Sequence, residues 1–389
     1  PPPPPPPFQA EDGIRDTSHC LVGSEMCIRD RSTSTQARGV AARMVTGTVR
    51  RFKQVLLRRV LEPTWQLEDE LAARPGGVHA TTGSPRRIEI IEESMQVEGL
   101  HRPMPGFPRS LPHVLSSARN IKASLTEVGE NPAQPRTSMS RTARDELEAF
   151  IRSTDVDTFG YTRIGPEVVF EGKSVLHPNA IVLAMEMDKA RMETAPSPDS
   201  AVMVHETYNQ LGIAANAIAR HLRESGYSAQ AGHPLGGLTL YPPMGQAAGL
   251  GWQGMHGLLI TPEFGPRVRL AAVFTSIEDL PHDDSDEHAW IEDFCRECVK
   301  CLRRCPPQAI NTEPVRHESG RVTWIDHDRC LPYFVRNNGC SICIKVCPFN
   351  QREYGWLKER WDRHGERATR LRADPPENFP QHLRTPPVS

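Results

Sequence analysis

The stretches CRECVKCLRRCP (295–306) and CLPYFVRNNGCSICIKVCP (330–348) contain eight of the ten cysteines in this chain of 389 residues. The first stretch follows the spacing C-x2-C-x2-C-x3-C-P, which holds paired 4Fe-4S clusters and in which the fourth cysteine binds the other cluster. The second stretch ends in the same way, but nine residues separate its first cysteine from its second. The spacing therefore predicts a module with two 4Fe-4S clusters over residues 288–352.

The crossed rule assigns four cysteines to each cluster. We predict that the first set is Cys295, Cys298, Cys301 and Cys347. We predict that the second set is Cys305, Cys330, Cys340 and Cys343. Thiolates also suit zinc, but zinc sites typically show two C-x2-C pairs, whereas three close cysteines and a distant C-P favour a cubane. Disulfide frameworks are typical of short secreted chains, so the cysteines indicate metal clusters and electron transfer.

Composition narrows the classes of partner. The net charge is −2 and 24% of the residues are charged, which gives no reason to expect nucleic acid or an acidic membrane as the main partner. No apolar run reaches the 18 or more residues that a membrane helix needs, so we expect no membrane span. Clusters of this kind need a reducing compartment or protective burial, and we therefore expect a cytoplasmic protein.

The N-terminal part of the chain differs from the rest in its composition and in the structure that it predicts. Residues 1–31 begin with seven prolines and continue with a segment similar to translated sequencing-adapter sequence, so we treat them as non-native and expect the native N-terminus to be missing. Residues 36–61 are basic and amphipathic, which favours a solvated helix. Arg50-Arg51-Phe52-Lys53 looks like a twin-arginine export signal, but further arginines interrupt the apolar stretch, so export is not expected. We expect a loop-rich extension over 32–140 and a C-terminal tail over 353–389.

Regular structure is predicted between these regions, over residues 141–280. The patterns predict a helix at 141–153, a helix at 206–225 that ends at Gly226, and strands at 159–164, 180–187 and 267–274. Alternating helices and strands suggest an α/β layer domain. A pair of clusters alone provides only a short path for electrons and needs few residues, so a domain of this size implies a second redox centre. The alternative is a domain that only docks partners.

Several segments of this domain resemble the reductive dehalogenase family. They are NAIVLAMEMD (179–188), TAPS (194–197), AGLGWQGMHG (248–257) and LLITPEFGPRVRLAAVFT (258–275), together with the delayed second cysteine motif. The resemblance covers roughly residues 140–352. It implies a nitroreductase-like α/β (α+β) domain that binds a corrinoid of the cobalamin type, followed by a ferredoxin-like module that delivers electrons to cobalt. It also implies a small organohalide substrate and a low-potential electron donor such as ferredoxin or flavodoxin.

The corrinoid is implied by the resemblance alone. The sequence contains no D-x-H-x-x-G motif that would supply a histidine to cobalt, which fits a cofactor held by loops. Glycine lets backbone approach a flat macrocycle closely. The candidate contacts are Gly249, Gly251, Gly254, His256 and Gly257. His256 could equally be a histidine that bonds to a loop carbonyl.

The resemblance also implies two catalytic residues. Tyr208 stands nineteen residues before Tyr227, the place of the family's proton-donating tyrosine. Arg269 matches the basic residue that would stabilise the phenolate left after proton transfer, because a guanidinium is always protonated. The alternatives are core packing for Tyr208 and a surface ion pair for Arg269, and Arg267 could exchange roles with Arg269. Val204 and the loop 232–240 depart from the family pattern where substrate would lie.

Two other functions stay open from the sequence. Epoxyqueuosine reductase resembles the same architecture and acts on a modified tRNA base, although it differs where this chain reads TPEFGPRVR. A corrinoid-free electron carrier with two clusters would contain iron but no cobalt. The cobalt and iron content of the protein therefore separates the electron carrier from the enzymes.

Overall fold

The computed structural model describes residues 64–87, 107–282, 286–318 and 321–373. The adapter-like segment 1–31, the basic segment 36–61 and residues after 373 lie outside the described residues, so what the sequence predicts for them stays a prediction. All the described residues belong to one structural unit, residues 57–389. No helix in these described ranges is both long and apolar enough to cross a membrane.

Four strands form the central sheet, in the order β2 (Thr158–Arg163), β4 (Asn179–Glu186), β8 (Val268–Thr275) and β5 (Ala229–Gly232). All three neighbouring pairs are antiparallel, so the domain mixes helices with an antiparallel sheet and is α+β. The side chains of β4 and β8 are almost all buried. Burial on both faces explains why these two strands are continuous apolar runs, and the three predicted strands are confirmed to within one residue.

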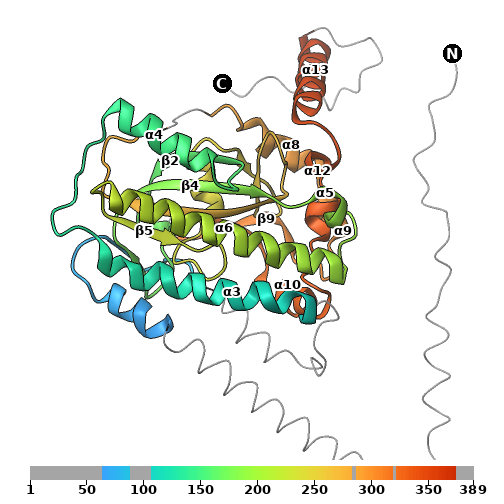
Figure 1. The fold of residues 1–389 in the computed structure, drawn as a ribbon. Helices are drawn as coiled ribbons and strands as arrows, with labels where there is room; N and C mark the ends of the chain where they lie inside the picture. Colours follow the sequence, from blue (N-terminus) through green and yellow to red (C-terminus); the bar gives the residue numbers. More distant parts are fainter. Residues whose placement is uncertain (1–63, 88–106, 283–285, 319–320, 374–389) are drawn as a thin grey trace, which may run out of the picture. The chain divides into compact units, whose positions relative to one another are not determined.

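Helices cover both faces of this sheet (Figure 1). The helices α4 (Arg141–Arg152) and α6 (Pro198–Glu224) pack on one face, in a core that includes Leu147, Ile218 and Val273. The helix α7 (Tyr241–Ala247) packs on the opposite face, in a core that includes Met244 and Phe274. Residues 64–87 add a helical segment over 64–72 and the short strand β1 (Val78–His79), which pairs with β3 (Ser174–Val175).

The long helix α6 has a well-defined start and end. Ser197 and Ser200 form a capping box at its N-terminus, in which each side chain accepts a hydrogen bond from the backbone of the other. Gly226 has a φ of 85°, so it stops the helix in the left-handed conformation, as predicted. The predicted helix began at residue 206; the structure extends it back to Pro198, because the cap lies in the TAPS segment.

The helix α3 (Phe107–Thr126) corrects the expectation of a loop-rich segment over 32–140. It packs mainly against α6, and the two helices lie side by side (Figure 1). Its buried positions include Ser110, Ser117 and Ser124, seven residues apart, which are 1–6% exposed. Small polar side chains allow close helix packing but produce no apolar periodicity, and so the sequence pattern gave no signal for this helix.

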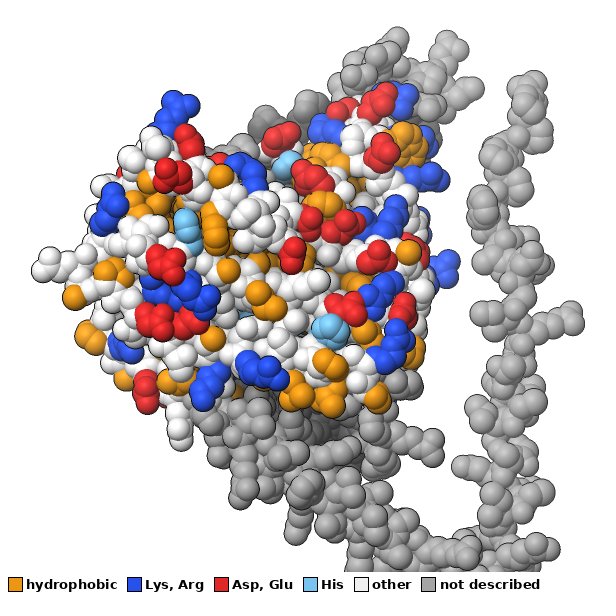
Figure 2. All heavy atoms as spheres, viewed as in Figure 1, with side chains coloured by type: hydrophobic (Ala, Val, Ile, Leu, Met, Phe, Trp, Pro, Cys, Tyr) orange, Lys and Arg blue, Asp and Glu red, His pale blue; other side chains and the backbone are white. Residues whose placement is uncertain are grey.

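Charged side chains of both signs are interspersed on the face of the molecule that carries α3 and α6 (Figure 2). Arg220 and Arg223 of α6 both pair with Glu127 of the 3-10 turn η1 (Glu127–Glu130), which directly follows α3. Asn120 of α3 donates to Asn209 of α6 at 3.2 Å. Polar contacts therefore complement the serine seam between these two helices.

The cysteine module, residues 288–352, is made of short helices and strands. They are α8 (Trp290–Cys298), α9 (Lys300–Arg304), β9 (Ile310–Arg316), β10 (Val322–Ile325), α10 (His327–Arg336), α11 (Ile342–Lys345) and α12 (Pro348–Gln351). The strands β9 and β10 pair in an antiparallel hairpin. A further helix, α13 (Tyr354–Ala373), follows the module in the stretch that the sequence suggested as a tail. The remaining elements, which connect the sheet to its helices, are η2 (Pro166–Val168), α5 (Lys189–Met192), β6 (Trp252–Gln253) and β7 (Leu259–Ile260).

Candidate functional site

The first predicted cysteine set comes together around one cavity. Cys295 and Cys298 lie on α8, Cys301 lies on α9, and Cys347 directly precedes α12. These four cysteines line a single cavity with aromatic and aliphatic neighbours, and none of the other four cysteines borders it. Cys347 therefore reaches this cavity although it belongs to the second motif, which is the crossed arrangement that the spacing predicted.

The second set also comes together. Burial raises the pKa of Cys330 to about 11, and the nearby thiols of Cys305 and Cys340 add to this effect. Burial likewise raises the pKa of Cys343 to about 12, with contributions from Cys340, Cys301 and Cys330. Because Cys343 interacts with Cys301 of the first set, the two sets are neighbours. Two clusters held here would form a short path for electrons.

The donor set fits iron–sulfur chemistry. Burial also raises the pKa of Cys295 to about 12, so a cluster must displace protons from these buried thiols when it binds. Within the described ranges, no three His, Cys, Asp or Glu side chains are arranged to hold one metal ion. A cubane does not require such an arrangement, because its four cysteines surround a whole cluster of irons.

Several residues around the cysteines have unusual backbone conformations. Val299, Cys340 and Ser341 have φ values of 43°, 41° and 62°, in the left-handed region that non-glycine residues rarely adopt. Val299 lies between two cysteines of the first set, and Cys340 is itself a member of the second. Such strain is maintained where the surroundings fix the chain, and these turns direct the neighbouring thiols toward a common centre.

The two predicted catalytic residues lie in direct contact. Tyr208 is on α6 and Arg269 is on β8, and the guanidinium carbon of Arg269 lies 4.6 Å from the centre of the Tyr208 ring. Both side chains are partly buried, and the Nε atom of Arg269 is buried without a hydrogen-bond partner. The strand register places Met185 of β4 opposite Arg269. This geometry positions a cation over the phenol ring, and the catalytic roles of the two residues stay a prediction.

His205 joins this pair and was not predicted from the sequence. Its ring centre lies 6.5 Å from that of Tyr208, one helical turn along α6. Burial, together with the charges of Arg269 and His113, lowers the pKa of His205 to about 4. The imidazole is therefore neutral at neutral pH, and its buried Nδ1 has no partner. The spacing H-x-x-Y on one helix face was the available signal.

Arg267 has a different role from Arg269, which resolves the ambiguity between them. It precedes β8, and its guanidinium donates to Glu186 at 2.7 Å and to the side chain of Asn350 at 3.0 Å. Gly265 lies against the backbone of Phe349, and a Cβ atom there would be 2.2 Å from its carbonyl oxygen. The segment TPEFGPRVR thus docks the loop after Cys347 onto the sheet, while its last arginine reaches Tyr208.

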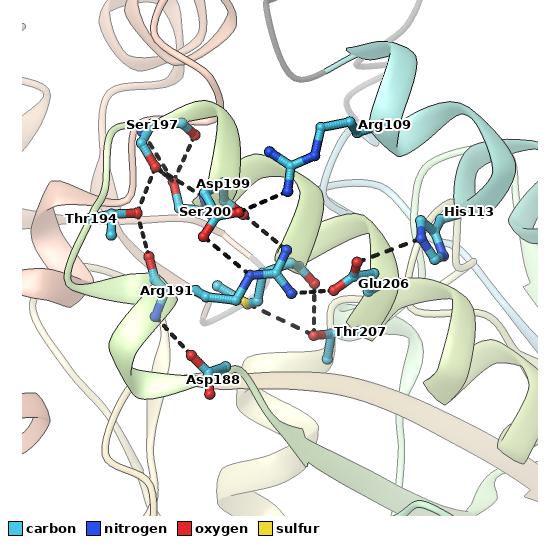
Figure 3. A network of polar contacts seen from close by, with 11 residues as sticks. Arg109, His113, Asp188, Arg191, Thr194, Ser197, Asp199, Ser200, Glu206 and Thr207 are labelled. Atoms are coloured by element: carbon cyan, nitrogen blue, oxygen red, sulfur yellow. Dashed lines mark hydrogen bonds and ion pairs between the residues drawn. The ribbon is translucent and has the colours of Figure 1, made fainter.

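A network of charged side chains fixes the N-terminal half of α6 (Figure 3). Arg191 of α5 pairs with Glu206 and, at 3.5 Å, with Asp199. Glu206 also lies 3.6 Å from the imidazole of His113 on α3, and Arg109 of α3 pairs with Asp199 at 3.0 Å. Three helices are tied together in this way along the part of α6 that precedes Tyr208.

The five residues suggested as corrinoid contacts lie in and before the β6–β7 hairpin. A Cβ atom at Gly251 would lie 2.0 Å from the carbonyl oxygen of Ile260, and one at Gly254 would lie 2.7 Å from its side chain. His256 is 3% exposed and lines the cavity of the first cysteine set. The other two glycines, with φ values of 72° and 74°, are Gly249 and Gly257. Packing against Ile260 accounts for Gly251 and Gly254, whereas Gly257 lies against Ile325 of β10. That these five residues contact a corrinoid stays a prediction.

A large cavity of about 700 Å³ lies between α7 and the cysteine module. It is bordered by Thr162, Met244, Trp324 and Cys295, so it reaches one cysteine of the first set. Cavities of this size commonly bind ligands. However, Met244 packs on the face of the sheet opposite α6, so a molecule in this cavity would not contact Tyr208. This cavity and the predicted pair of Tyr208 and Arg269 therefore lie on opposite faces of the sheet.

Comparison with known proteins agrees with this site. A family model described as a 4Fe-4S dicluster domain matches residues 294–351, which include all eight cysteines. The tetrachloroethene reductive dehalogenase of Desulfitobacterium hafniense is 34% identical over 226 residues, covering 54% of this chain and 39% of that protein. The epoxyqueuosine reductase of Gloeobacter violaceus is 32% identical over 148 residues, covering 33% of this chain and 40% of that protein.

A solved structure supports the same relationship at the level of the fold. It is a reductive dehalogenase, described as suggesting a mechanism for B12-dependent dehalogenation, with a TM-score of 0.52 and 20% identity, covering 74% of this chain and 45% of that one. The chain spans about two fifths of the length of the curated relatives it matches. The suspected similarity to reductive dehalogenases, and in architecture to epoxyqueuosine reductases, is confirmed.

Proposed function

We propose that this protein is a reductive dehalogenase-like oxidoreductase, in which two 4Fe-4S clusters deliver electrons to a reaction centre beside Tyr208 and Arg269. The contact between this tyrosine and this arginine is the observation that carries the proposal. The two residues belong to elements that are far apart in the sequence, α6 and β8. Their contact places a proton donor beside a fixed positive charge. The similarity to tetrachloroethene reductive dehalogenases supports an organohalide as the substrate.

The path of the electrons follows from the packing of the second cysteine set. Cys343 packs against an apolar cluster that contains Met203, and Val204 packs there too. Val204 lies one helical turn before Tyr208 on α6, a rise of about 5.4 Å. We assign the second set to the cluster next to the reaction centre, and the first set to the cluster that receives electrons from a low-potential donor.

The overall reaction needs two electrons and one proton, and it replaces the carbon–halogen bond with a carbon–hydrogen bond and releases halide. Tyr208 supplies the proton from its hydroxyl group, since a phenol is protonated at neutral pH. Arg269 stabilises the phenolate that remains, because its guanidinium stays charged and lies over the ring. The neutral His205 adds no further positive charge and leaves its Nδ1 available to orient the substrate or the phenol.

The relatives imply a corrinoid, and we propose that one binds in a nitroreductase-like domain over residues 141–280. When bound, it would supply a low-valent cobalt able to cleave a carbon–halogen bond. We place this corrinoid on the side of α6 that carries Tyr208. The buried unpartnered atoms of Arg269 and His205 are the polar groups that fit a reaction centre there.

Metal content tests this proposal first. Protein prepared without oxygen and reconstituted with iron, sulfide and cobalamin should contain about eight irons per chain and one cobalt. Iron at that level without retained cobalt would reject a corrinoid-dependent enzyme and leave a simple electron carrier.

Loss of the phenol tests the chemistry. With reduced methyl viologen as donor, Tyr208→Phe should release halide roughly 100-fold to 10,000-fold more slowly, because general acid catalysis is worth about that much. Tyr227→Phe is the matched control, since this buried tyrosine bonds to the carbonyl of Ser138 away from the pair. Undiminished halide release by Tyr208→Phe would reject the proton donor.

Epoxyqueuosine reduction is the second candidate, and its support is the match to the cyanobacterial epoxyqueuosine reductase over 148 residues. The match covers a smaller part of this chain than the dehalogenase match does. The same reconstituted protein should be offered an epoxyqueuosine-containing tRNA stem loop. Conversion of this RNA without halide release from organohalides would favour the second function over the first.

A further inference from the structure

The turn of the β6–β7 hairpin carries a histidine into the cavity of the first cysteine set. His256 is 3% exposed, and it lines this cavity together with Cys295, Cys298, Cys301 and Cys347. Gly254 leaves room for the ring, because a Cβ atom at that position would lie 3.0 Å from its Cε1 atom. The imidazole is therefore held against the place where four thiolates would bind a cluster.

Hydrogen bonding determines which nitrogen carries the proton. The backbone N–H of Leu258 donates to Nδ1 of His256 at 3.3 Å, so Nδ1 is the acceptor. In a neutral ring the proton then lies on Nε2. This Nε2 is buried and has no hydrogen-bond partner in the part of the chain that the structure describes. A buried donor without an acceptor calls for a partner.

The residue before His256 also lies close to one cysteine of the same set. Met255 is 3% exposed, and Cys295 packs against the apolar cluster that contains it. The turn thus holds His256 close to the first cysteine set. Sulfur atoms of a cluster accept hydrogen bonds from nearby N–H groups, and these bonds influence the reduction potential.

We propose that His256 donates a hydrogen bond from Nε2 to a sulfur of the cluster held by the first cysteine set, and thereby raises the reduction potential of this cluster. A reduced cluster carries one more negative charge, which a directed N–H dipole stabilises. The cysteines around this cavity are largely buried, and burial disfavours that charge, so a donor at this point offsets the cost. The inference rests on a cluster at this cavity and is independent of the proposed halide chemistry.

The test is a redox titration of the whole reconstituted chain, followed by electron paramagnetic resonance. His256→Leu removes the donor, and His256→Gln keeps an N–H group near the same position. His317→Leu is the matched control, since His317 lies on the β9–β10 hairpin of the same module and bonds to Thr323. We expect His256→Leu to lower the midpoint potential of one cluster only, His256→Gln to restore part of the shift, and His317→Leu to leave both potentials in place.

Proton hyperfine spectroscopy of the reduced, unsubstituted protein gives a second measurement that does not depend on how well the variants assemble. With 15N-labelled histidine, the cluster signal should show coupling to one histidine nitrogen and to a proton that exchanges in heavy water. Absence of this coupling, or equal potentials in His256→Leu and unsubstituted protein, would overturn the proposal. Loss of halide release with the coupling intact would reject only the proposed function.

Discussion

The sheet domain (residues 141–280) and the cysteine module (288–352) are stabilised in different ways. The two large apolar cores on either side of the sheet contain only residues before 281. The apolar clusters that include module residues also draw on the sheet domain, through residues such as Met255, Ile260 and Met203. The sheet domain and the residues before it therefore form their cores without the module, whereas the module depends on its neighbour and on the groups that its cysteines bind.

Removal of iron should separate the two regions most clearly. The helices α9, α11 and α12 have only five, four and four residues, and helices this short are not stable alone. After chelation under reducing conditions, we expect amides of the module to exchange with heavy water, while those of β4 and β8 stay protected. Hydrogen-exchange mass spectrometry measures both regions at once. Equal loss of protection in the two regions would contradict the difference described above.

Cys347 and Cys305 are each predicted to bind the cluster of the other motif, so their substitution should affect the two clusters of the module separately. Cys347→Ala and Cys305→Ala should each lower the iron content from about eight to about four per chain, because each removes a ligand of one cluster. Only Cys347→Ala should abolish the signal that is sensitive to His256. Iron analysis and electron paramagnetic resonance of both variants check this expectation. The reverse assignment would show that the ligands follow sequence order instead of crossing.

Arg267, which pairs with Glu186 of its own domain and donates to Asn350 of the module, should make the strongest single polar link between the two regions. Its side chain is 7% exposed and that of Glu186 is 35% exposed. Arg267→Met should lower the free energy of unfolding by about 2–3 kcal/mol, below the full value for a buried pair. Urea unfolding of the iron-loaded protein measures this change.

The control for that prediction is Arg363→Met on α13, which breaks an exposed pair with Glu359. Its effect should stay below about 0.5 kcal/mol, as for other exposed helix pairs. A similar small effect for Arg267→Met would mean that the module is held mainly by its apolar contacts.

The sheet domain should have an acid sensitivity that is independent of iron. His233 is 2% exposed, and burial lowers its pKa to about 4, compared with about 6.5 in an unfolded chain. Between these two values the unfolded chain binds more protons, so the stability present above pH 6.5 is lost as the pH falls toward 4. This single group should contribute roughly 3 kcal/mol to that loss.

His233→Asn tests this expectation, because the asparagine can still accept the hydrogen bond that Leu235 donates to Nδ1. Urea unfolding at pH 7 and pH 4.5 should show a smaller difference for this variant than for the unsubstituted protein. The exposed His282→Asn should show the unsubstituted difference. An unchanged pH dependence in His233→Asn would mean that other groups determine the acid sensitivity.

The cysteine sets show what a sequence can predict well. Four ligands of a cubane must meet at one point, and short fixed spacings such as those from Cys295 to Cys301 allow few arrangements. The central strands were also predictable, because burial on both faces demands continuous apolar runs such as that from Ala180 to Met185. In both cases short local spacings carry most of the physical requirement, and for the clusters the distant ligands Cys347 and Cys330 follow from the repeated motif.

Other parts of the site depend on contacts that no local pattern records. Arg267 and Arg269 are two residues apart, so a strand places both on the same face. Only the position of the module shows which of them reaches Tyr208. His205 acquires its neutral state from burial between helices. The glycines near His256 suggested a ligand-binding loop, and only the folded chain shows that Gly251 and Gly254 lie against Ile260 and that Gly257 lies against Ile325 of the module. These features follow from tertiary packing and require the folded structure.

The serine seam of α3 limits how this protein can change over evolutionary time. Ser110, Ser117 and Ser124 are buried on α3, which packs mainly against α6, and larger side chains at these positions would push α3 away from its neighbours. Because α6 carries Tyr208, a larger side chain at any of these three positions would disturb the proposed proton donor from a distance. Loss of a hydroxyl group would leave that spacing intact. Substitutions at these three positions should therefore favour alanine and glycine. Selection that maintains Tyr208 should in this way also restrict residues that do not contact it.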